Sequence, residues 1–179
     1  MFGRIFGFLL GAIVIGAAVH VASVYFLPQA IMMWTIHKIG SEGMNTMRFG
    51  KRPDETARAI VRPSPDLLYS TCAYDLSTGP VAVHAPVPDN TYWSVSLFDD
   101  KTNNFYVAND RQMHAEKKTV MDLLVVPAGA HSGTKDMPAV ESPSTTGLVL
   151  IRTLIDDDRK LAALDAFRRK ATCRTWHQP

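Results

Sequence analysis

The chain has 179 residues, a length that favours one domain with a short appendage. Hydrophobic residues make up 46% of the sequence, and the formal net charge is only +2. So small a charge argues against nucleic-acid binding, which needs Lys and Arg clustered on one surface, and we expect no nucleic-acid partner. The apolar residues are unevenly spread, because residues 5–27 carry no formal charge while the sequence after Gly40 has the composition of a soluble domain.

Residues 5–27 are long enough to cross a membrane as a helix. At about 1.5 Å per residue they span roughly 34 Å, whereas a hydrocarbon core is about 30 Å thick. A cleaved signal peptide is the alternative, with Arg4 before the apolar run and small residues at 16–18 as a cleavage site. The run continues to Leu27, which is too long for a cleaved segment, so we predict a transmembrane helix that anchors the chain in the lipid bilayer.

Residues 28–60 are predicted to be an interfacial and linking segment. Pro28 removes a helical hydrogen bond and predicts a kink, after which residues 29–39 form a short amphipathic continuation. Trp34 and Lys38 are residue types found at the level of lipid headgroups. A short helix is then expected from Pro53, because proline fits the first helical position.

Small residues recur every four positions in the apolar segment, at Gly3, Gly7 and Gly11. This spacing lets two membrane helices approach closely. A homo-oligomer, or contact with another membrane helix, through these glycines is one interpretation. The alternative, that glycine is simply common in membrane helices, is favoured.

The positive charges flanking residues 5–27 are nearly balanced, with Arg4 before the segment and Lys38 and Arg48 after it. The charges therefore leave the orientation open. An uncleaved signal anchor is expected to place the protein in the inner membrane as a single-pass protein with its domain in the periplasm.

Residues 61–172 are predicted to form one β-rich domain. Alternation is clearest in residues 91–98, where Trp93, Val95 and Leu97 fall on one face and the serines between them fall on the other. Further runs of strand length are residues 67–74, 81–85, 105–108, 120–126 and 148–155. The regular spacing of turns predicts a mainly β fold, either a sandwich or a jelly-roll-like sheet.

A C-terminal helix is predicted at residues 156–171, with Asp156 or Asp157 as its cap. Residues 127–146, rich in Pro, Gly, Ser and Thr, are expected to form a long loop that either covers a site or has no fixed structure.

The two cysteines, Cys72 and Cys173, lie too far apart in sequence to suggest a thiolate metal site. They form a disulfide if the domain faces an oxidising compartment, or stay as two buried thiols. The sequence does not decide between these alternatives.

The acidic residues Asp66, Asp75 and Asp99 are candidates for paired carboxylates in acid–base catalysis. Asp75 and Asp99 border turns, where aspartate bonds to nearby backbone amides, and this structural role is favoured. The aromatic residues Tyr69, Tyr92 and Trp93 either line an apolar ligand pocket or belong to the core, and the core is favoured. No motif indicates a metal or a cofactor.

One block of sequence resembles the bacterial family called domain of unknown function 1254. The block is Arg-Pro-Ser-Pro-Asp-Leu-Leu-Tyr-Ser at 62–70, followed by Asp75-Leu76, Gly79-Pro80 and Tyr92-Trp93. Arg152-Thr153-Leu154 is similar to the closing segment of that family, so the resemblance covers about residues 60–170. Where relatives read Asn-x-Asp-Thr, this chain has Ser64, Asp66 and Leu67, which weakens any polar site built there.

The resemblance implies a β-rich protein that is envelope-associated or secreted. Longer members of the family join this domain to a domain of unknown function 1214. A separate membrane protein carrying that second domain is therefore the expected partner of a short, membrane-anchored member.

Together these observations predict a non-catalytic accessory or interaction module of the cell envelope, with no assigned catalytic residue, metal or cofactor. The alternatives are a membrane-tethered hydrolase that uses Asp66, Asp75 and Arg152, and a domain that binds a small ligand. The candidate binding residues are Arg62, Asp66, Tyr69, Asp75, Tyr92, Trp93 and Arg152.

Overall fold

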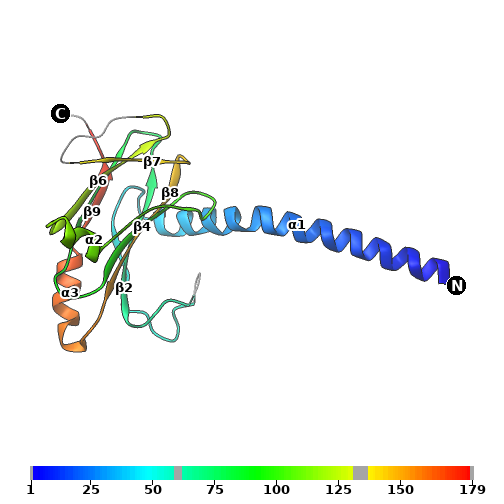
Figure 1. Cartoon of the computed structure of the whole chain (residues 1–179), viewed down its shortest axis with the longest axis horizontal. Helices are drawn as coiled ribbons and strands as arrows, with labels where there is room; N and C mark the ends of the chain where they lie inside the picture. Colours follow the sequence, from blue (N-terminus) through cyan, green and yellow to red (C-terminus); the bar gives the residue numbers. More distant parts are fainter. Residues whose placement is uncertain (1, 59–61, 131–136, 178–179) are drawn as a thin grey trace.

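The computed structural model describes residues 2–58, 62–130 and 137–177. Within these residues the chain forms a two-sheet β-sandwich at the end of a long N-terminal helix, with a short helix near the C-terminus (Figure 1). The predicted mainly β fold is therefore confirmed, and of the two architectures considered the structure has the sandwich.

The N-terminal helix α1 (Phe2–Gly40) runs through Pro28 without a break. Its apolar part has a mean hydropathy of 2.3 and is fully exposed, so α1 is long and apolar enough to cross a membrane. Because Pro28 has no amide hydrogen, the carbonyl of Val24 lacks its usual helical partner. Residues 29–39 continue the helix, and the side chains of Met32 and Ile36 are buried against the sandwich, a contact that the sequence did not predict.

The strands of the described residues form two sheets. Sheet A, in spatial order, contains β1 (Arg48–Phe49), β2 (Leu67–Asp75), β8 (Thr146–Leu154), β4 (Trp93–Phe98) and β5 (Asn104–Asn109). Sheet B contains β7 (Ala139–Ser142), β6 (Val120–Pro127), β3 (Val81–Pro86) and β9 (Thr172–Thr175). The strands pair antiparallel except for β6 and β7, which are parallel. Strands β2 and β8 are far apart in sequence but pair directly in sheet A.

The core lies between the two sheets and is built by alternation along the strands. Trp93, Val95 and Leu97 on β4 are at most 2% exposed, as their spacing predicts. The intervening Ser94 and Ser96 are also buried, although a half-buried strand would expose them to water. On the face of sheet A that points away from the core, the Arg152 side chain donates a hydrogen bond to each of these serines.

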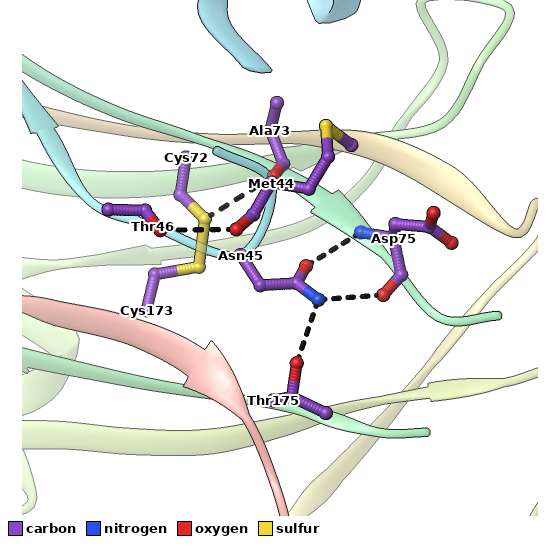
Figure 2. The surroundings of a disulfide bond; sticks show 8 residues. All are labelled: Met44, Asn45, Thr46, Cys72, Ala73, Asp75, Cys173 and Thr175. Carbon is purple, nitrogen blue, oxygen red and sulfur yellow. Dashed lines mark hydrogen bonds between the residues drawn. A yellow bond between two sulfur atoms is a disulfide. The ribbon is translucent and has the colours of Figure 1, made fainter. Parts of the chain in front are cut away.

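A disulfide joins Cys72 on β2 to Cys173 on β9 and so ties sheet A to sheet B (Figure 2). The alternative of two free thiols is thereby excluded. Beside it, the Asn45 side chain accepts a hydrogen bond from the Asp75 amide at 2.7 Å and donates to the Asp75 carbonyl at 2.9 Å. The Asn45 amide also donates to Thr175 Oγ1 at 3.0 Å, so the segment after α1 is fastened to both sheets.

The prediction of a helix from Pro53 is wrong for the described part of that segment, which forms a turn at residues 55–56. The Asp54 carboxylate accepts hydrogen bonds from the Thr56 amide at 2.8 Å and from the Thr56 hydroxyl at 2.6 Å. Such local bonds offer the backbone an alternative to the helix. Residues 59–61, where that helix would have continued, lie outside the described residues.

The C-terminal helix is confirmed but shorter than residues 156–171. It comprises a 3₁₀ turn, η1 (Asp158–Lys160), and helix α3 (Leu161–Arg168). The Asp157 carboxylate accepts a hydrogen bond from the Arg159 amide at 2.9 Å, so Asp157 is the cap.

Four further elements of the described residues were not predicted, namely β1, α2, β7 and β9. Helix α2 (Asp110–Ala115) begins with a capping box between Asn109 and Gln112. The long loop at residues 127–146 contains β7, and its residues 131–136 lie outside the described part of the chain.

Candidate functional site

The face of sheet A that points away from the core carries the candidate site, and we call it the outer face. It is identified by alternation, because Cys72 and Val95 point into the core while their neighbours point outward. Tyr69 on β2 lies directly opposite Arg152 on β8, and Arg152 lies directly opposite Ser94 on β4. Residues from three strands therefore form one row across this face.

Arg152 lies at the centre of this row and is half-buried. Its Nε donates to Ser94 Oγ at 3.2 Å and its Nη2 donates to Ser96 Oγ at 3.3 Å. The Tyr92 hydroxyl donates to the same Ser94 oxygen at 2.9 Å. These partners are neutral, and within the part of the chain that the structure describes Arg152 makes no ion pair with a carboxylate. Its charge is therefore available to an anionic ligand.

The structure brings together only some of the candidate binding residues. Tyr69, Tyr92 and Arg152 gather on the outer face. Trp93 belongs to the core, as favoured from its strand position, and Arg62 is exposed.

The candidate carboxylates are separated, and two of them have turn roles. Asp66 precedes β2 and Asp75 ends it, and at about 3.3 Å per residue the strand holds them roughly 30 Å apart. The Asp75 carboxylate accepts from the Ser77 amide at 2.8 Å. The buried Asp99 carboxylate accepts from the amides of Lys101 and Asn103, both at 2.8 Å. Asp66 and Asp75 therefore cannot form a catalytic pair with each other.

A histidine–carboxylate pair lies on the other sheet. His84 Nδ1 is 2.8 Å from Asp122 Oδ1, on neighbouring strands β3 and β6 of sheet B. Because Arg152 belongs to sheet A, the pair and Arg152 do not share a site.

An apolar cleft of about 520 Å³ lies between α1 and the outer face. Its helix side is lined by Ile31 and Ile39, and its sheet side by Thr71, Leu148 and Leu150. The cleft was not predicted from the sequence, because residues 29–39 were expected to lie at a membrane surface. The available signal was the helical spacing of Met32, Ile36 and Ile39, which marks an apolar stripe.

Arg168 of α3 fixes the strand that carries Tyr69. It is 4% exposed, and it donates to the Tyr69 carbonyl at 2.7 Å and to the Gly50 carbonyl at 2.6 Å. Burial lowers the pKa of its guanidinium, and the hydrogen bond to Asp165 at 2.7 Å opposes that shift. Burial alone raises the pKa of Asp165, but the hydrogen bonds from Arg169 and Arg168 outweigh it and the pKa is lowered.

The molecule is thus a β-sandwich attached to an apolar helix, with an apolar cleft on the sheet face next to that helix. Beside the cleft lies the row of Tyr69, Arg152 and Ser94, which we call the cationic row after its arginine. The family model for the protein of unknown function DUF1254 matches residues 44–175. The chain therefore belongs to the DUF1254 family, as the resemblance predicted. No curated protein matches the chain.

Two solved structures share the fold. The VPA0106 protein from Vibrio parahaemolyticus is 14% identical with a TM-score of 0.63, and the match covers 84% of this chain and 35% of that one. An uncharacterized protein from Burkholderia cenocepacia is 14% identical with a TM-score of 0.50, and the match covers 89% of this chain and 43% of that one. This chain therefore spans less than half the length of the solved proteins that it resembles.

Proposed function

We propose that the protein is a non-catalytic accessory module of the cell envelope, anchored in the inner membrane by α1 and acting through a partner protein. The packing of α1 on the sandwich carries this proposal. Met32 and Ile36 are buried together with Ala73 and Leu148, so the helix is part of the domain instead of a loose tether. A helix that is apolar on one half and packed on the other holds the sandwich next to the bilayer.

The periplasmic side of the membrane is the proposed location of the sandwich. The disulfide between Cys72 and Cys173 supports it, because disulfides persist in the periplasm and are rare in the cytosol.

A separate protein carrying the domain of unknown function 1214 is the proposed partner. This idea rests on membership of the DUF1254 family, whose longer members are expected to join this domain to that second domain. Contact within the membrane is proposed through Gly3, Gly7 and Gly11, with a second copy of the chain or with the partner. A side-chain carbon added at any of these glycines meets no atom within 4 Å, so this stripe of α1 is open to another helix.

The non-catalytic role is supported by the distance between Asp66 and Asp75 and by the turn role of the Asp75 carboxylate. The hydrolase alternative requires these residues to act together with Arg152. The double variant Asp66→Asn and Asp75→Asn discriminates, because the accessory role predicts an unchanged phenotype with an intact fold.

Crosslinking in intact membranes followed by affinity purification of the full-length chain tests the partner. We expect a discrete crosslinked species that is lost when Gly7 and Gly11 are both replaced by Leu. A chain that remains solitary at every crosslinker length would contradict the proposal.

A further inference from the structure

The apolar cleft between α1 and the outer face extends toward the membrane-spanning part of the helix. A second cavity, of about 470 Å³, follows α1 and is lined by Val24 and Leu27. The two cavities share Ile31 and Thr102 as lining residues, so they are adjacent along the helix. Val24 and Leu27 lie at the end of the segment that is apolar enough to cross a membrane. An apolar molecule in the bilayer therefore has an apolar path along the surface of α1 toward the cleft.

The opposite end of the cleft reaches the cationic row. Leu148, Leu150 and Arg152 alternate along β8, so they point to the same face at intervals of about 7 Å. Leu148 and Leu150 line the cleft, and Tyr69, which lines it as well, lies directly opposite Arg152. Arg152 itself lies just beyond the lining residues, next to Leu150 on the same face of β8 and opposite Tyr69. The hydrogen-bond partners of its half-buried guanidinium in the described structure are two serine hydroxyls.

The apolar cleft and the neighbouring Arg152 are together complementary to an amphiphile with one anionic end. The apolar lining favours a hydrocarbon chain, because its burial removes apolar surface from water. The planar fork of Arg152 favours a carboxylate, which accepts two parallel charge-assisted hydrogen bonds. Ser94 and Ser96 hold the guanidinium in place, and among the described residues no carboxylate forms an ion pair with it.

We propose that the cleft binds a long-chain fatty acid, with its carboxylate on Arg152 and its chain along Leu150 and Leu148 toward α1. The fatty acid enters sideways from the bilayer along Val24 and Leu27. This inference goes beyond the accessory role, and it holds whether or not a partner protein is found.

Binding of palmitate to the full-length chain in phosphatidylcholine nanodiscs tests the proposal, with 1-hexadecanol as the uncharged probe of equal chain length. We expect Arg152→Met, which keeps an unbranched apolar side chain but removes the charge, to weaken palmitate binding at least about tenfold. Binding of 1-hexadecanol should change little. Arg159→Met is the matched control, because the Arg159 side chain is 90% exposed and belongs to η1, not to the strands of the outer face, and it should bind palmitate like the wild type.

A second variant, Thr71→Trp, fills the cleft while keeping Arg152 and is expected to abolish binding of both probes. Disulfide formation and circular dichroism establish that each variant is folded, and Thr71→Trp tests the cleft even if Arg152→Met does not fold. The proposal is overturned if the wild type does not bind palmitate, if both probes bind equally well, or if Arg159→Met is as weak as Arg152→Met. It is also overturned if the cleft retains a phospholipid or a peptide that palmitate does not displace.

Discussion

Arg168 is the buried charge on which the packing of α3 depends. Its guanidinium donates to the carbonyls of Tyr69 and Gly50 and to the Asp165 carboxylate. Replacing it with Ala removes these hydrogen bonds from the interior, so we expect a loss of about 3 kcal/mol in the free energy of unfolding. Thermal unfolding of the full-length chain in detergent, followed by circular dichroism, measures the loss.

Arg169→Ala is the control for that prediction, because Arg169 binds the same Asp165 from an exposed position. An exposed ion pair contributes at most about 1 kcal/mol. Equal destabilisation by the two variants would contradict the role assigned to Arg168.

The buried Tyr74 side chain is expected to lower the free energy of unfolding at high pH. Burial raises its pKa from 10.0 to about 12, since the charged phenolate is disfavoured in the core. A raised pKa means that the folded state holds the proton more tightly than the unfolded state. The stabilisation is therefore fully present below pH 10 and is lost as the pH rises toward 12.

Ultraviolet titration of the tyrosines measures this effect, with a late phenolate transition whose amplitude falls in Tyr74→Phe. Burial also raises the pKa of Tyr106, so part of the late transition remains. A wild-type chain whose tyrosines all titrate near pH 10 would rule out the buried environment of Tyr74.

At the scale of residues, local sequence was enough to predict some roles and not others. The turn roles of Asp75 and Asp99 follow from bonds to amides within four residues, which the sequence displays directly. The meeting of Tyr69 and Arg152 depends on the register between β2 and β8, strands separated by most of the domain. Short-range patterns carry no information about that register, so the cationic row could not be predicted.

Among the elements, the disulfide between β2 and β9 is expected to contribute strongly to stability. It closes a loop of 101 residues, and replacing both Cys72 and Cys173 with Ser should lower the free energy of unfolding by about 2–4 kcal/mol. Denaturation of oxidised and reduced wild-type protein provides the comparison, since reduction should reproduce the effect of the double variant. Unfolding that is insensitive to both changes would argue against a structural role.

The packing of α1 on the sandwich gives a second prediction at this scale. Ile36 is 8% exposed against the sheet, so Ile36→Gln should loosen the helix and speed amide hydrogen exchange in residues 29–40 at least about tenfold. Met33 is 59% exposed on the same turn of helix, which makes Met33→Gln the matched control. Similar exchange in the two variants would show that the contact does not hold the helix.

The long strands were predictable because alternation marks them, as on β4. The four-residue strands β7 and β9 were not, since so short a run contains too few residues to show a period. β9 is a strand because it pairs with β3 and carries the disulfide, and both contacts are made by distant parts of the chain.

For the whole molecule, the proposed orientation predicts the behaviour of C-terminal reporter fusions. Alkaline phosphatase fused after the last residue should be active, because it folds only where its own disulfides form. A cytosolic reporter such as green fluorescent protein should be dark in the same position. The opposite pattern would place the sandwich in the cytosol and exclude a stable disulfide between Cys72 and Cys173 in the cell.

The fold class could be predicted at this scale, and the attachment of the helix could not. Composition separates the apolar N-terminus from the β-rich remainder, which is sufficient for a helix plus a sandwich. Whether residues 29–39 lie on a membrane or on the sandwich depends on which apolar surface is nearer in three dimensions. The cluster of Met32 and Ile36 with Ala73 decides it in the folded chain.

The unbroken course of α1 has a mechanical consequence for the anchored protein that we propose. A helix whose apolar length exceeds the local bilayer thickness tilts, and a flexible tether would absorb that tilt. Here one helix runs from the N-terminus to the sandwich (Figure 1). Its last turns are packed on the sandwich through Ile36, so a tilt in the bilayer moves the whole sandwich with it. The height of the sandwich above the lipid and its angle to the membrane then change with bilayer thickness.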